Sequence, residues 1–153
     1  MKKILKFLGL ILLAIVLYIG YLIMNPVSPL EKVTFKNNEL TFDVEYSRPF
    51  KKDRLIFGNK SEGALVPFGE YWRTGANAAT NFSINSEITI SGIQLMSGKY
   101  RLYTVPGEEQ WEVFVNSEAD TFFAITEPDS AKDLMSFKVT PQQLNETVEQ
   151  FTI

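Results

Sequence analysis

The sequence contains no cysteine and no histidine among its 153 residues. Without cysteine, the chain cannot form disulfides, thiolate zinc sites or a cysteine nucleophile, and it cannot be a lipoprotein anchored through an N-terminal cysteine. Without histidine, it lacks the commonest general base near neutral pH and the commonest metal ligand. An enzyme built from this sequence would depend on carboxylates, lysine, tyrosine or serine alone. We therefore favour a non-catalytic protein and expect neither a cofactor nor a metal site.

Acidic residues are absent before Glu31, whereas Lys2, Lys3 and Lys6 lie near the start of the chain. From Leu30 onward the chain carries 12 basic and 18 acidic residues, which gives this part a net charge of −6. Such a surface repels phosphate backbones, and this argues against a nucleic-acid partner.

Phe7 to Met24 reads FLGLILLAIVLYIGYLIM, a run of 18 residues without a charge. As a helix it spans roughly 27 Å, close to the thickness of the hydrocarbon core of a bilayer. Asn25-Pro26 ends the helix, and the three preceding lysines mark the cytoplasmic side. We predict a transmembrane anchor over residues 1–25, with the lipid bilayer as the partner of Phe7 to Met24.

This anchor would place the N-terminus in the cytoplasm and the rest of the chain in the periplasm or on the cell surface. A cleaved signal peptide is the alternative. Against cleavage, the apolar run exceeds the usual ~7–15 residues and no small-x-small site follows promptly.

Residues 26–32 form a short linker, and residues 33–153 form a single domain in which apolar and polar residues alternate with period two. Helical periodicity is scarce, and we expect a helical turn only around Glu127–Lys132 or Pro141–Leu144. Asn85-Ser86 and Pro106-Gly107 are expected to close β-hairpins. The predicted strands are 33–35, 40–46, 54–57, 80–84, 87–91, 100–105, 111–115, 135–139 and 148–153. Their spacing predicts an all-β fold, an antiparallel β-sandwich or barrel-like domain preceded by one N-terminal transmembrane helix.

Two stretches interrupt the alternation, YSRP at 46–49 and LVPFGEYWRTGAN at 65–77. With R-x-I-F-G at 54–58, LMSGKYRLYTVPG at 95–107 and WEVFVN at 111–116, the chain resembles the bacterial family catalogued as domain of unknown function 2911. The resemblance runs from about Val33 to Phe151. It implies an exported or envelope protein but no defined activity. Members carry a glutamate where this chain has Ala78, and they continue into a further hairpin, which implies that strands are missing after Ile153.

The interrupting stretches combine aromatic rings with guanidinium groups, a combination typical of polar pockets with stacking walls. We expect the arginines to recognise a carboxylate or sugar hydroxyls. In the structural alternative, Arg48 and Arg73 bond loop carbonyls or pair with Asp43, Glu45 or Glu70. The tryptophans would then be core packing. The candidate ligand-binding residues are Tyr46, Arg48, Trp72, Arg73 and Asn77.

The sequence therefore predicts a membrane-tethered extracytoplasmic β-domain that acts as a non-catalytic binding or envelope-assembly module. Its expected partner is another protein or a small polar ligand. The alternative is a carboxylate-dependent hydrolase of envelope polysaccharide. That enzyme would need two carboxyl groups facing each other across a cleft, roughly 5–9.5 Å apart.

Overall fold

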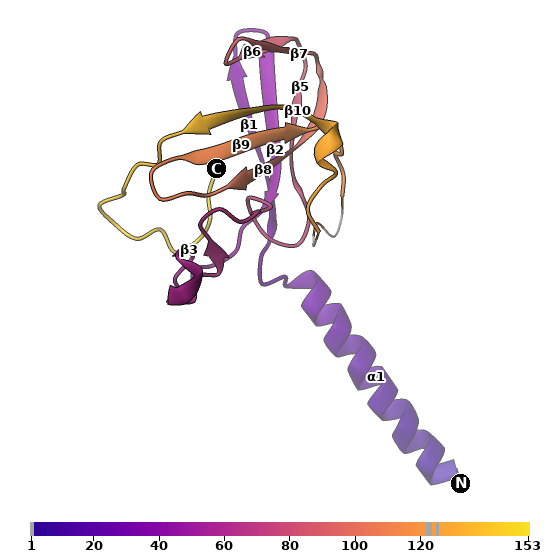
Figure 1. Cartoon of the computed structure of the whole chain (residues 1–153). Coiled ribbons are helices and arrows are strands. Elements are labelled where there is room, and N and C mark those ends of the chain that lie inside the picture. Colours follow the sequence, from indigo (N-terminus) through magenta and orange to yellow (C-terminus); the bar gives the residue numbers. More distant parts are fainter. Residues whose placement is uncertain (1, 122–123, 125) are drawn as a thin grey trace.

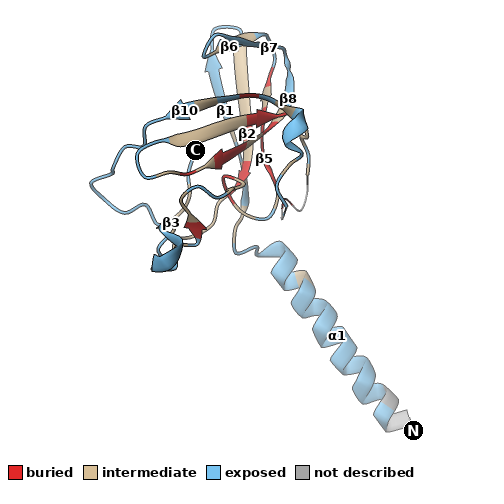
Figure 2. Ribbon diagram, in the orientation of Figure 1, coloured by how far each residue is buried: buried red, intermediate tan, exposed pale blue. Residues whose placement is uncertain are grey.

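The computed structural model describes residues 2–121, 124 and 126–153, so Met1 of the predicted anchor lies outside the described residues. A single α-helix, α1 (Lys2–Met24), projects away from a β-rich domain (Figure 1). Its stretch from Lys6 to Met24 has a mean hydropathy of 2.7, and its described side chains are exposed apart from a single half-buried residue (Figure 2). Helix α1 is thus long and apolar enough to be a membrane anchor or a signal sequence.

The domain is organised around one six-stranded sheet in which every neighbouring pair of strands is antiparallel. In their order across the sheet, the strands are β1 (Leu30–Asn37), β2 (Leu40–Ser47), β5 (Thr80–Ile84), β8 (Gly98–Val105), β9 (Trp111–Asn116) and β10 (Asp133–Val139). Strands β1 and β10 lie at opposite edges, so the described strands do not close into a barrel. The predicted all-β antiparallel class is confirmed.

Two pairs of short strands accompany the large sheet. Strand β3 (Phe57–Gly58) pairs in parallel with β4 (Val66–Pro67), and β6 (Ile88–Ile90) pairs antiparallel with β7 (Ile93–Leu95). Figure 1 shows β6 and β7 at the end of the domain away from α1, whereas β3 lies at the end from which α1 extends. Two single 3₁₀ turns, η1 (Lys60–Glu62) and η2 (Ser130–Lys132), complete the described elements.

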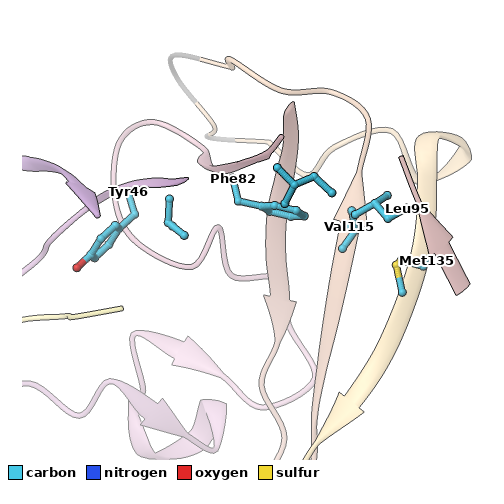
Figure 3. Packing of buried hydrophobic residues seen from close by; sticks show 7 residues of the cluster. Tyr46, Phe82, Leu95, Val115 and Met135 are labelled. Carbon is cyan, nitrogen blue, oxygen red and sulfur yellow. The ribbon is translucent and has the colours of Figure 1, made fainter. Parts of the chain in front are cut away.

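The core follows from the alternation that the sequence shows. In β2, Val44 and Tyr46 are buried on the inner face, while Asp43 and Glu45 point to the other face, because successive side chains of a strand point to opposite sides. Seven buried side chains from five strands of the domain form the core cluster (Figure 3). They are Val44, Tyr46, Phe82, Ile84, Leu95, Val115 and Met135. Since Leu95 belongs to β7, the β6–β7 hairpin covers one end of the inner face.

The predicted hairpin at Asn85-Ser86 is wrong. Strand β5 pairs with β2 and β8, and β6 turns back onto β7 instead. The Asn85 side chain accepts a hydrogen bond from the Thr41 amide at 2.7 Å and donates one to the Glu39 carbonyl at 2.7 Å. These bonds fix the end of β5 to the β1–β2 turn, so the chain leaves the sheet there.

The last predicted strand, residues 148–153, is also wrong, because this segment makes a single bridge between Phe50 and Gln150. Of the two expected helical turns, only the first appears, as η2; residues 141–144 are irregular. Strand β1 begins at Leu30 rather than residue 33, since Leu30 still pairs with Ser47. The predicted strand 54–57 is reduced to Phe57 and the following glycine.

Candidate functional site

A cavity of about 560 Å³ opens at the end of the domain next to the linker. Its size lies in the ~300–1,000 Å³ range of sites for small ligands. Five stretches of chain surround it: the linker, the segment that leads into β3, the start of β4, the segment after β4 and the C-terminal segment. The lining residues are Val27, Ser28, Pro49, Phe50, Lys51, Lys52, Arg54, Ile56, Phe57, Leu65, Val66, Trp72, Gly75, Ala76, Leu144, Val148, Glu149, Phe151 and Thr152.

Four aromatic rings pack edge to face at the inner side of the cavity. The Trp72 ring centre lies 5.0 Å from Phe57 and 5.1 Å from Phe151, and 6.0 Å from Trp111, which itself lies 4.7 Å from Phe57. Trp72 is held by its backbone, which exchanges two hydrogen bonds with Thr104 of β8. Edge-to-face packing of this kind stabilises aromatic clusters, so the apolar wall is a fixed surface.

The C-terminal segment forms a second wall, and side chains of β2 and the residue after it hold that segment in place. Arg48 donates from Nε to the Phe151 carbonyl at 2.9 Å and from Nη2 to Thr152 Oγ1 at 2.8 Å. Its Nη1 pairs with the Glu31 carboxylate. The Ile153 amide donates to Tyr46 Oη at 3.0 Å. Two backbone bonds, from the Lys51 amide to the Glu149 carbonyl at 2.7 Å and from the Phe151 amide to the Pro49 carbonyl at 3.0 Å, add to this guanidinium and phenol in holding the wall.

The third wall is the loop 73–77, where the backbone takes uncommon conformations. Thr74 and Asn77 have φ of 56° and 58°, and Gly75 has φ of 150°. A Cβ on Gly75 would lie 2.9 Å from the Ser47 carbonyl oxygen, so only glycine fits here. Arg73 Nη1 donates to the Asn77 carbonyl at 3.3 Å and spans the loop.

The other face of the large sheet carries a buried polar network away from the cavity. Tyr103 Oη donates to Asp133 Oδ2 at 2.7 Å, and Asn116 Nδ2 donates to Asp133 Oδ1 at 2.7 Å. Burial, and after it the hydrogen bond to Asp133, raise the pKa of Tyr103 above its ordinary value. Arg101 is only 2% exposed and donates to Tyr71 Oη at 2.6 Å. These hydrogen bonds link β8 to Tyr71 and to the start of β10, and they stabilise the sheet.

Some acidic side chains outside the cavity each form an ion pair with a single lysine. Glu118 Oε1 pairs with Lys132 at 2.6 Å, and the hydrogen bond from Lys132 lowers the pKa of Glu118. Asp120 pairs with Lys99. Within the described part of the chain, no three acidic side chains come together as ligands of a metal ion.

Residues 28–153 match the family described as "Protein of unknown function (DUF2911)". The chain belongs to this family. No curated protein and no solved structure matches it. The DUF2911 match covers the whole β-domain and begins within the linker that follows α1.

Of the five site residues predicted from the sequence of this DUF2911 protein, Trp72 alone lines the cavity. The other four lie behind its walls. Tyr46 and Arg48 form hydrogen bonds to the C-terminal segment, which is one wall. Arg73 donates to the Asn77 carbonyl within the loop that forms another wall. Both guanidinium groups bond protein oxygens, as the structural alternative expected, although the acidic partner of Arg48 is Glu31.

Sequence reasoning missed most of the lining residues. Ile56 belongs to the R-x-I-F-G motif, whereas Leu144, Val148 and Phe151 lie in segments without a motif, and none of these four side chains carries a reactive group. One signal was present: residues 148–153 contain the apolar residues Val148, Phe151 and Ile153, which we interpreted as part of a strand, and Val148 and Phe151 instead line the cavity.

Proposed function

We propose that this DUF2911 protein is a membrane-tethered binding module that takes an apolar group into the cavity beside its linker. The observation that carries the proposal is a ligand-sized cavity whose walls are mainly apolar and aromatic. Trp72 would contact the ligand. Tyr46 and Arg48 would position the C-terminal wall, since their side chains are bonded to that segment, and Arg73 would position the loop wall through its bond to the Asn77 carbonyl. The sequence favoured a polar ligand, and the engagement of both arginines moves the proposal toward an apolar one.

The tether in this proposal is α1, retained as an anchor with the domain on the extracytoplasmic side. Its support is the hydropathy of the helix and the lysines that precede the apolar run. N-terminal sequencing of the mature protein is expected to begin at Met1 or Lys2. A sequence that begins near Val27 or later would show a cleaved signal peptide and would remove the tether.

Binding is favoured over hydrolysis because of the carboxylates at the cavity. Glycoside hydrolysis requires a pair of carboxyl groups on either side of the bond to be cleaved. Among the described lining residues Glu149 is the only carboxylate, and its Oε1 accepts from the Lys52 amide at 2.9 Å. The described residues that line this cavity include no second carboxyl group that could act with Glu149 in hydrolysis.

The experiment uses the only two tryptophans of the chain, Trp72 and Trp111, which both belong to the aromatic cluster. Bromine quenches indole emission at close range. The full chain in vesicles of ordinary phospholipid would be titrated with a brominated alkanol, and we expect saturable quenching.

Ala76→Phe is expected to abolish this quenching, because Ala76 lines the cavity and a phenyl ring would fill it. Ala78→Phe is the matched control, since Ala78 is equally half-buried but does not line the cavity. Thermal unfolding of both variants checks that they are folded. Equal quenching in the two variants, or quenching that does not saturate, would refute the proposal.

A further inference from the structure

The cavity lies close to the end of the apolar helix. Val27 and Ser28 of the linker line the cavity, and α1 ends at Met24. The three residues from Met24 to Val27 span at most about 10 Å when extended. The Arg48 amide donates to the Pro29 carbonyl at 2.9 Å, which fixes the far end of the linker to the domain. With α1 in a bilayer, the cavity is therefore held at the membrane surface whatever angle the helix takes.

The mouth of the cavity exposes aliphatic side chains to solvent. Val27, Leu65, Leu144 and Val148 all line the cavity, and they are respectively 65%, 56%, 65% and 53% exposed. Exposed apolar side chains gathered around one cavity mark a place where a partner removes them from water. At the surface of a bilayer, the apolar partner within reach is the acyl region of the lipids.

Basic side chains line the same cavity. Among the residues that the structure describes, Lys51, Lys52 and Arg54 take part in none of the ion pairs. Arg54 donates instead to the carbonyls of Phe50 and Lys51, which leave its charge uncompensated. Glu149 is the only acidic residue in the described lining. In a domain with an acidic surface, this local excess of positive charge suits an anionic head group.

We propose that the cavity takes an acyl chain of an anionic phospholipid from the membrane that holds α1, with the head group against Lys51 and Lys52. The inference rests on the proposed function, because it needs a cavity that accepts apolar ligands. A cavity of about 560 Å³ has the size for one drug-sized group. It would thus take one chain, while the rest of the lipid stays in contact with the bilayer.

The experiment places the full chain in phospholipid vesicles in which a small fraction of the phospholipid carries bromine on its acyl chains. Since α1 contains no tryptophan, quenching reports only chains that reach Trp72 and its neighbour Trp111. Brominated phosphatidylglycerol is expected to quench at a lower mole fraction than brominated phosphatidylcholine.

The double variant Lys51→Gln/Lys52→Gln is expected to raise the mole fraction of phosphatidylglycerol needed for half-quenching about 30-fold, since each lysine contributes about 1 kcal/mol near an anionic surface. The control Lys36→Gln/Lys138→Gln removes two exposed lysines that do not line the cavity, and it should leave this mole fraction unchanged.

The outcomes separate this inference from the proposed function. Quenching by the brominated alkanol but by neither phospholipid would overturn the lipid inference and leave the binding function standing. Absence of quenching by all three probes would refute both. Equal quenching by the two phospholipids, with the lysine variant unchanged, would overturn the assignment of an anionic lipid.

Discussion

Replacing Arg48 by alanine removes the side chain that holds the C-terminal wall of the cavity. Two hydrogen bonds, to the Phe151 carbonyl and to Thr152 Oγ1, are lost together with the ion pair to Glu31. A hydrogen bond that involves a charged group contributes ~1.5–3 kcal/mol. Because the Arg48 side chain is 24% exposed, solvent weakens these bonds, and we assign each hydrogen bond about 1.2 kcal/mol, just below the lower end of that range. The partly exposed ion pair adds about 0.5 kcal/mol.

The free energy of unfolding should therefore fall by about 3 kcal/mol, which for a domain of this size lowers Tm by about 10 °C. Thermal unfolding of the full chain in detergent micelles, followed by Trp emission, measures this change. Lys60→Ala is the control, because the Lys60–Glu70 pair is 81% and 47% exposed and such a surface pair contributes little to stability. If both variants unfold within about 2 °C of each other, the wall does not depend on Arg48 and the reasoning fails.

Gly75→Ala should destabilise the domain by about 3 kcal/mol in urea unfolding, because its φ is 150° and the new Cβ would lie 2.9 Å from the Ser47 carbonyl. Gly69→Ala, at a φ of 81° with open space around it, should cost about 1 kcal/mol, and equal costs would contradict this account. The raised pKa of Tyr103 means that its neutral form stabilises the fold fully below the ordinary pKa of about 10 and loses this contribution as pH rises further. The free energy of unfolding, measured between neutral and strongly alkaline pH, should thus fall more in the wild type than in Tyr103→Phe. If the two proteins lose stability in parallel, ionisation of Tyr103 and its hydrogen bond to Asp133 are not coupled to folding.

The large sheet could be predicted from sequence because its strands obey a simple pattern. Residues 40–46 alternate over a whole strand, and the turn after Asn37 joins two strands in continuous register. Pro106-Gly107 closes the β8–β9 hairpin where expected. Asn85-Ser86 has equally good turn residues, and yet its asparagine bonds the β1–β2 turn instead. A local sequence does not reveal a side-chain partner more than 40 positions away.

The candidate site was predictable only in part, for a related reason. Sequence reasoning selects residues with reactive or ionic side chains, and it found Trp72 together with the four residues that hold the walls. The surface of the cavity itself is aliphatic and aromatic, and such residues look the same in a core and in a pocket. What distinguishes them is exposure, such as the 53% of Val148, and exposure is a property of the fold.

The roles of the two arginines follow from the irregular backbone around the cavity. Segment 73–77 lacks a strand partner and segment 149–153 has only the bridge at Gln150, so several of their carbonyl groups need donors from elsewhere. A guanidinium offers five donors in fixed directions, and Arg48 and Arg73 use theirs on these carbonyls. A loop rich in arginine and aromatic residues can in this way build an apolar cavity, with its charges turned toward the protein. In the proposal of a bound anionic phospholipid, the charge of the head group is consequently recognised by Lys51 and Lys52 and not by the arginines of the motif.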